Sequence, residues 1–221
     1  NPISADFITL QDNVADNQGG MVTFTANNAT NGGNVTGWNI IPVSAREFVW
    51  QGGTGNWSDP SHWKVNGDIN NPSQCIPGSL DSVFFNGTSG AGAVTIDIAN
   101  ANCKDMTWSG TNGLELAGGA TKNLNVYGSL TFENNLNLTY LGDINFLATT
   151  SGKTITTSGK KFLRNVKFDG VGGTWTLQDS LDCSECQATE LVNGNLITNN
   201  KKVKAVTFNT YAGGNLTLGS S

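Results

Sequence analysis

Short alternations of apolar and polar residues, each bounded by glycine, asparagine or serine, constrain this chain more than any other feature. They recur at Val94–Ile98, Leu136–Leu138, Thr154–Thr156 and Leu216–Leu218. No stretch keeps apolar residues at helical spacing long enough to form a helix. A period of two is the pattern of a strand with one buried face, and the flanking residues are typical of turns. The sequence therefore predicts an all-β fold.

The spacing between these runs favours a solenoid over a sandwich. Apolar-x-aromatic triplets begin at Met106, Val166 and Val206, and both intervals between these starts are multiples of about 20 residues, the length of a short solenoid rung. A second pattern, Val-x-Gly-x-Leu, begins at Val126 and again at Val192. One rung of a parallel β-helix takes roughly 20–25 residues, within the range of solenoid repeats. We interpret each pattern as one wall of a coil seen on different rungs, and we predict a parallel β-helix.

The chain divides by pattern into three segments. Residues 1–43 hold short strands and break at Pro42, and we interpret them as the end and cap of a preceding β repeat unit. Residues 44–93 are a tryptophan-rich entry and capping segment, and residues 94–221 are the regular rungs. The predicted architecture is a parallel β-helix with a small N-terminal β segment.

Composition limits the partners and the chemistry. Only 13% of residues are charged, whereas there are 28 glycines, 29 asparagines and 25 threonines. The net charge of −5 and the absence of a basic stripe argue against nucleic acid. No apolar run approaches the ~20 residues that cross a bilayer, so we expect no direct membrane insertion. A single histidine is a poor inventory for acid–base catalysis.

Four cysteines suggest an oxidising compartment, because the number is even. We predict a structural disulfide between Cys75 and Cys103, worth about 3–4 kcal/mol from the loop it closes. Cys183 and Cys186 form a C-x-x-C pair with acidic neighbours and no following helix, which argues against a thioredoxin-like site. Zinc would need a second such pair. We expect either a small local disulfide or two packed thiols at a turn.

Three tryptophans, Trp50, Trp57 and Trp63, lie close together in the sequence. One hypothesis makes them a platform on which sugar rings stack. The preferred hypothesis makes them a cap, because a solenoid needs bulky side chains to close its open end. His62 lies beside Trp63 and is assigned to the same cap.

The acidic residues offer two candidate sites. Asp97, Glu115 and Glu133 recur at equal intervals and are the best enzymatic candidates, since solenoid enzymes stack acids on neighbouring rungs. Asp68 and Asn70 are a calcium option, because calcium prefers oxygen ligands, but their spacing fits turns better. We predict no catalytic residues and no cofactor, with calcium as the alternative.

A family resemblance lies in the segment Phe48–Trp63, which reads Phe-Val-Trp-Gln-Gly-Gly-Thr-Gly-Asn-Trp-Ser-Asp-Pro-Ser-His-Trp, and continues through Cys75–Pro77 and Asp81–Phe85. This opening resembles repeat units of giant secreted surface proteins of Bacteroidetes-type bacteria. It is also similar to the β-helical passenger domains of autotransporter adhesins. The resemblance implies a right-handed parallel β-helix, export to the bacterial cell surface, and a role in adhesion or surface architecture. It brings no catalytic residues.

The sequence therefore predicts a non-enzymatic, secreted surface module, either an adhesin or a stalk segment. The first alternative is a carbohydrate-binding module that uses exposed tryptophans. The second is a polysaccharide lyase or hydrolase on the same fold. The expected partners are flanking repeat units of the same polypeptide and an extracellular polysaccharide or a host-surface ligand.

Overall fold

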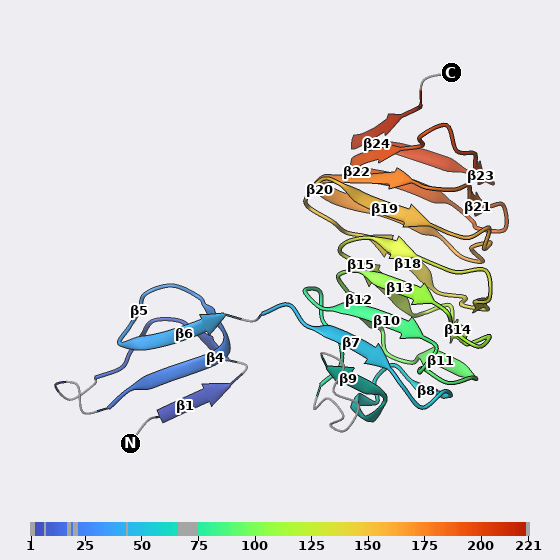
Figure 1. The fold of residues 1–221 in the computed structure, drawn as a ribbon. Helices are drawn as coiled ribbons and strands as arrows, with labels where there is room; N and C mark the ends of the chain where they lie inside the picture. Colours follow the sequence, from blue (N-terminus) through green and yellow to red (C-terminus); the bar gives the residue numbers. More distant parts are fainter. Residues whose placement is uncertain are drawn as a thin grey trace. The chain divides into compact units, whose positions relative to one another are not determined.

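Short β-strands make up almost all the regular structure, as the alternating pattern predicts. The computed structural model describes residues 3–6, 8–16, 19, 22–42, 44–65 and 75–219 (Figure 1). The chain divides into two compact units, residues 1–45 and 46–221, which we describe separately. Among the described residues, no helix is long and apolar enough to cross a membrane.

The larger unit is a parallel β-solenoid with three walls. Its first wall stacks β12 (Asn100–Cys103), β15 (Asn123–Val126), β18 (Asp143–Phe146) and the first halves of β20 (Val166–Leu177), β22 (Thr189–Ile197) and β24 (Phe208–Thr217). The second wall stacks β7 (Glu47–Trp50), β10 (Ser82–Asn86), β13 (Met106–Ser109), β16 (Leu130–Thr131), β19 (Lys153–Thr156) and the second halves of the same three long strands. The third wall stacks β8 (Gly55–Asn56), β11 (Ala93–Ile96), β14 (Glu115–Gly118) and β17 (Asn137–Leu138), and later rungs carry the pair β21 (Leu181–Cys183) and β23 (Val203–Ala205).

Strand register confirms the predicted rung length. Ala93 pairs with Glu115 on the next rung, and Leu130 pairs with Ile155. Both intervals lie within the roughly 20–25 residues of a β-helix rung. The first turn is longer, because Phe48 pairs with Val83 and the chain between them carries β9 (Trp63–Val65). β9 runs antiparallel to β7 and lies on the side of β7 opposite β10. The rungs therefore begin at Glu47, earlier than the predicted start at residue 94.

The assignment of the repeated triplets to one wall is wrong. Met106 lies on β13 in the second wall, whereas Val166 opens β20 in the first wall. Every wall has the same alternation of buried and outward residues. Similar triplets therefore indicate the same strand geometry, but they do not show which wall the strand belongs to. The second pattern also misses its register, because the residue three rungs above Val126 is Leu191 and not Val192.

The core of the solenoid is a column of stacked side chains. Residues that alternate inward on each strand are buried, and rings on successive rungs stack with centroids 4.0 Å apart for Phe85 and Trp108 and 4.9 Å apart for Phe146 and Phe168. Each such side chain contributes about 1.5–3 kcal/mol through burial. On the face of the first wall that points away from the core, amide side chains form a ladder, since Asn125 donates to Asn102 and accepts from Asn145.

The smaller unit is a short parallel stack as well. Its strands are β1 (Ile3–Asp6), β2 (Thr9–Leu10), β3 (Asn13–Val14), β4 (Phe24–Asn31), β5 (Val35–Thr36) and β6 (Trp38–Pro42). β4 pairs in parallel with β1, β2 and β6, and Ile3 meets Phe24 one rung later. Its described core is small and consists of Leu10, Ala26 and Ala29 with a few half-buried neighbours.

Candidate functional site

The three candidate tryptophans are buried and cannot present a sugar-binding platform. Trp50, Trp57 and Trp63 each have 0% of their surface exposed. Trp63 packs edge-on against both of the others, with ring centroids 4.9 Å from Trp50 and 4.8 Å from Trp57. A sugar stacks on an exposed ring face, and these faces are covered by protein. The hypothesis of a carbohydrate site on these tryptophans is therefore wrong.

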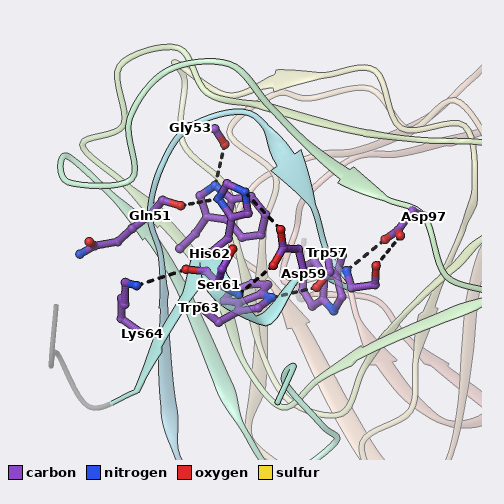
Figure 2. A network of polar contacts seen from close by, with 11 residues as sticks. Gln51, Gly53, Trp57, Asp59, Ser61, His62, Trp63, Lys64 and Asp97 are labelled. Atoms are coloured by element: carbon purple, nitrogen blue, oxygen red, sulfur yellow. Dashed lines mark hydrogen bonds and ion pairs between the residues drawn. The ribbon is translucent and has the colours of Figure 1, made fainter. Parts of the chain in front are cut away.

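Local hydrogen bonds hold this tryptophan cluster in the first rung. Trp50 Nε1 donates to Gly53 O at 2.8 Å, and Trp63 Nε1 donates to Trp57 O at 2.9 Å (Figure 2). Asp59 caps the 3-10 turn η2 (Pro60–His62) by accepting from Ser61 N at 2.9 Å, and hydrogen bonds from Ser61 lower the pKa of Asp59. Because β9 covers the edge of β7, the cluster closes the first rung.

His62 belongs to the same cluster. Its ring stacks on Trp50, with centroids 4.5 Å apart and planes 6° apart. Its Nδ1 lies 2.6 Å from Gln51 O (Figure 2). A carbonyl oxygen only accepts, so we assign a proton to Nδ1. Its Nε2 lies 3.9 Å from Asp59 Oδ2. A side chain at Gly55 would place Cβ 2.2 Å from Nε2, so glycine at this position makes room for the ring.

The predicted acidic series does not come together. Glu115 pairs in register with Ala93 on the rung before and with Asn137 on the rung after. Asp97 follows β11 and therefore lies past the partner of Glu115. The number of residues between successive acids is smaller than the number of residues in one rung. Each acid is therefore displaced along the strand relative to the acid on the neighbouring rung. Asp97, Glu115 and Glu133 form no catalytic constellation.

Each of these carboxylates is instead bonded to a neighbouring rung. Asp97 accepts from Ser58 N at 3.0 Å and from Ser58 Oγ at 2.5 Å (Figure 2). Glu133 accepts from the backbone nitrogens of Gly110 at 2.5 Å and Thr111 at 2.9 Å, and Glu115 accepts from Thr139 Oγ1. These contacts hold successive rungs together and leave the acids committed to structure.

Later rungs use their acids in the same way. Asp179 accepts from Thr157 N at 2.8 Å and from Ser158 N at 2.5 Å, one rung below. Asp182 forms an ion pair with Lys204 at 2.8 Å on the next rung, and this contact, together with hydrogen bonds from Ser184, lowers the pKa of Asp182 to about 2. An acid with so low a pKa stays ionised at neutral pH and is unsuited to proton transfer.

No group of three or more histidine, cysteine or acidic side chains that could hold a metal ion occurs among the described residues. The calcium option at Asp68 and Asn70 lies outside the described residues. That option remains a prediction.

Of the two predicted cysteine pairings, the structure contains one. Cys183 and Cys186 form a disulfide across the turn after β21, with Cα atoms 5.0 Å apart, which confirms the local bridge. The predicted Cys75–Cys103 bridge is wrong, because both are thiols. Cys75 Sγ accepts from Arg46 Nη1 at 2.9 Å, whereas Cys103 points into the core, 3.9 Å from Asn125 O. Sequence spacing does not reveal which way a sulfur faces.

Alkylation without reductant should separate these thiols. We expect iodoacetamide to modify Cys75 in the folded protein, to modify Cys103 only after unfolding, and to spare Cys183 and Cys186 until a reductant is added. Burial raises the pKa of the Cys103 thiol, and the thiolate is the reactive form. Mass spectrometry of the peptides reads the outcome. A cross-linked peptide joining Cys75 and Cys103 would contradict the structure.

A buried ion pair at the start of the solenoid escaped the sequence analysis. The Asp81 side chain is 3% exposed and accepts from Arg46 Nε at 3.1 Å, Arg46 Nη2 at 2.9 Å and Gly78 N at 2.8 Å. The hydrogen bond with Asp81 raises the pKa of Arg46. The signal was present in the sequence, because Asp81 belongs to the opening motif and Arg46 is one of two arginines. The sequence distance between Arg46 and Asp81, however, gives no indication that the two side chains meet.

Comparisons of this chain with protein-family models, with curated proteins and with solved structures found no match.

Proposed function

We propose that the chain is a non-enzymatic extracellular module, a stalk or adhesin segment of a bacterial surface protein. In this proposal the solenoid acts through its shape and stiffness, and its outer walls present a surface at a distance from the cell.

The observation that carries the proposal is the use of polar side chains to join successive rungs. These hydrogen bonds link residues about one rung apart and include Asn123 to Asn100, Asn145 to Asn125, Thr157 to Asp179, Asn193 to Asp169 and Thr217 to Asn195. Each contributes about 0.5–1.5 kcal/mol net. Like the backbone ladders between the same strands, they join one rung to the next. They therefore oppose separation of the rungs, which suits a load-bearing rod.

Two features support an extracellular setting. The Cys183–Cys186 disulfide is typical of oxidising compartments. The opening motif Phe48–Trp63, which resembles secreted surface repeats, closes the first rung of the solenoid through Trp50, Trp57 and Trp63. The motif therefore has a structural task in this chain, as expected for a repeat unit.

Incubation of the purified chain with neutral and acidic polysaccharides should release no reducing ends and no unsaturated products. The expected result is the same with calcium and with a chelator, because the strongest enzymatic candidates are bonded between rungs. The Asp97→Asn variant serves as the control. Product formed by the parent chain and abolished in this variant would overturn the non-enzymatic proposal.

A second experiment addresses location. Protease added to intact cells of the source organism should cleave the full-length protein, while a cytoplasmic marker in the same cells survives. Protection of the protein until the cells are lysed would overturn the surface proposal.

A further inference from the structure

A shallow groove lies at the corner where the first wall turns into the second. Its volume is about 190 Å³, and its described lining is Ser79, Leu80, Lys104, Tyr127, Leu147, Thr149, Thr150 and Lys153. The tryptophan cluster contributes nothing to it. Besides three hydroxyl residues it contains an aromatic ring, two leucines and two lysines, which the amide ladder on the first wall lacks.

The register of the first wall builds this groove. Cys103, Val126 and Phe146 stand in line on three successive rungs, so the next residues, Lys104, Tyr127 and Leu147, follow in the same order. Tyr127 N donates to Cys103 O at 2.9 Å and Leu147 N donates to Val126 O at 2.8 Å, so the ladder continues into the corner. Adjacent rungs are about 4.8 Å apart, which fixes the spacing of the three side chains.

The groove is positive on a chain of net charge −5. Among the described residues that line it are two lysines and no carboxylate. Lys153 forms no ion pair within the described part of the chain, and Lys104 reaches Asp105 Oδ2 only at 3.9 Å. Asp105 is also engaged elsewhere, because it accepts from Ser129 N at 2.7 Å and from Ser82 Oγ at 3.3 Å. Charge complementarity therefore favours an anionic ligand.

The apolar part of the lining narrows the ligand further. Tyr127 is half-buried and Leu80 is 50% exposed, so an aromatic side chain and an aliphatic one meet solvent together. Aromatic and aliphatic surfaces pack against the C–H faces of sugar rings. A uronate carries its carboxylate at the ring edge, which leaves a ring face open to Tyr127 while the anion meets a lysine.

We propose that this groove binds uronate residues of an acidic polysaccharide. The inference rests on the proposed surface function and names the ligand class that such a module would contact. Tyr127 supplies the stacking surface, and Lys104 on the rung before it and Lys153 on the rung after it supply the charge.

Binding of short oligogalacturonate, measured by isothermal titration calorimetry in a chelator, tests the proposal. The methyl-esterified oligomer keeps the sugar rings and removes the charge, and we expect it to bind about tenfold more weakly. Tyr127→Ala should weaken binding about tenfold, as expected for a central aromatic contact. Tyr127→Phe should retain binding, and Lys153→Ala should weaken it about threefold, as for a half-buried charge that still meets solvent.

Matched control residues lie near the C-terminal end of the described solenoid. Tyr211→Ala removes an exposed tyrosine on β24, and Lys202→Ala removes an exposed lysine, and neither residue lines the groove. Both should bind like the parent chain, and circular dichroism should show that all variants are folded. The proposed uronate site would be overturned if the parent chain did not bind, if the esterified oligomer bound equally well, or if the control variants lost as much binding as the groove variants. Unsaturated products in the same samples would overturn the non-enzymatic function, whereas the proposal of a uronate-binding groove would stand.

Discussion

Trp63→Ala is expected to lower the free energy of unfolding of the solenoid by about 3–5 kcal/mol, as for other large-to-small changes at buried aromatic positions. Trp63 is fully buried and packs edge-on against Trp50, Trp57, Phe48 and Phe85. Its loss opens a cavity in the first rung and leaves Trp57 O without the donor that it has in the folded protein. A solenoid rung packs against the first rung on one side only among the described residues, because β9 covers the other side. Few core side chains are therefore in position to move into the cavity.

Urea unfolding followed by circular dichroism measures this loss. Tyr211→Ala is the control, because Tyr211 is 48% exposed on the last rung and its removal should change stability by no more than about 0.5 kcal/mol. A Trp63→Ala variant as stable as the control would mean that Trp63 is not a core residue. That result would revive the hypothesis of an exposed sugar platform.

Asp81→Ala is expected to cost about 3 kcal/mol, because it leaves the Arg46 guanidinium beside a buried site without its carboxylate. The Arg46 side chain is 20% exposed, so water offsets part of the penalty and the value lies at the low end for buried pairs. The change also removes the acceptor of Gly78 N, which shapes the turn before β10.

A double-mutant cycle with Arg46→Met isolates the pair. We expect a coupling energy of at least about 1 kcal/mol, because the two side chains share a bidentate contact. The ion pair of Asp182 with Lys204 is the more exposed counterpart, since the Lys204 side chain is 51% exposed and the Asp182 side chain 17%. Lys204→Ala, which removes this ion pair and leaves the hydrogen bonds from Ser184 to Asp182 in place, should cost no more than about 1 kcal/mol. Additive losses at Arg46 and Asp81 would show that the contact contributes nothing of its own.

The local parts of the candidate sites could be predicted from the sequence. The Cys183–Cys186 bridge joins two cysteines of one turn, so the turn itself brings the sulfurs together. The Cys75–Cys103 bridge failed because those residues lie in different turns, and strand alternation turns Cys103 into the core. The groove at Tyr127 was not predicted, because its lining comes from segments whose neighbourhood depends on rung register.

What the sequence by itself determined is the all-β class and the approximate length of one rung. Both follow from alternation and turn residues that every rung repeats, so the information is local and redundant. Only the tertiary structure decided which wall each strand joins, because all three walls share one alternation and a shift of a single residue reverses the faces. It also decided that Trp50, Trp57 and Trp63 point inward, and that the acids bond between rungs, because both depend on what lies one rung away.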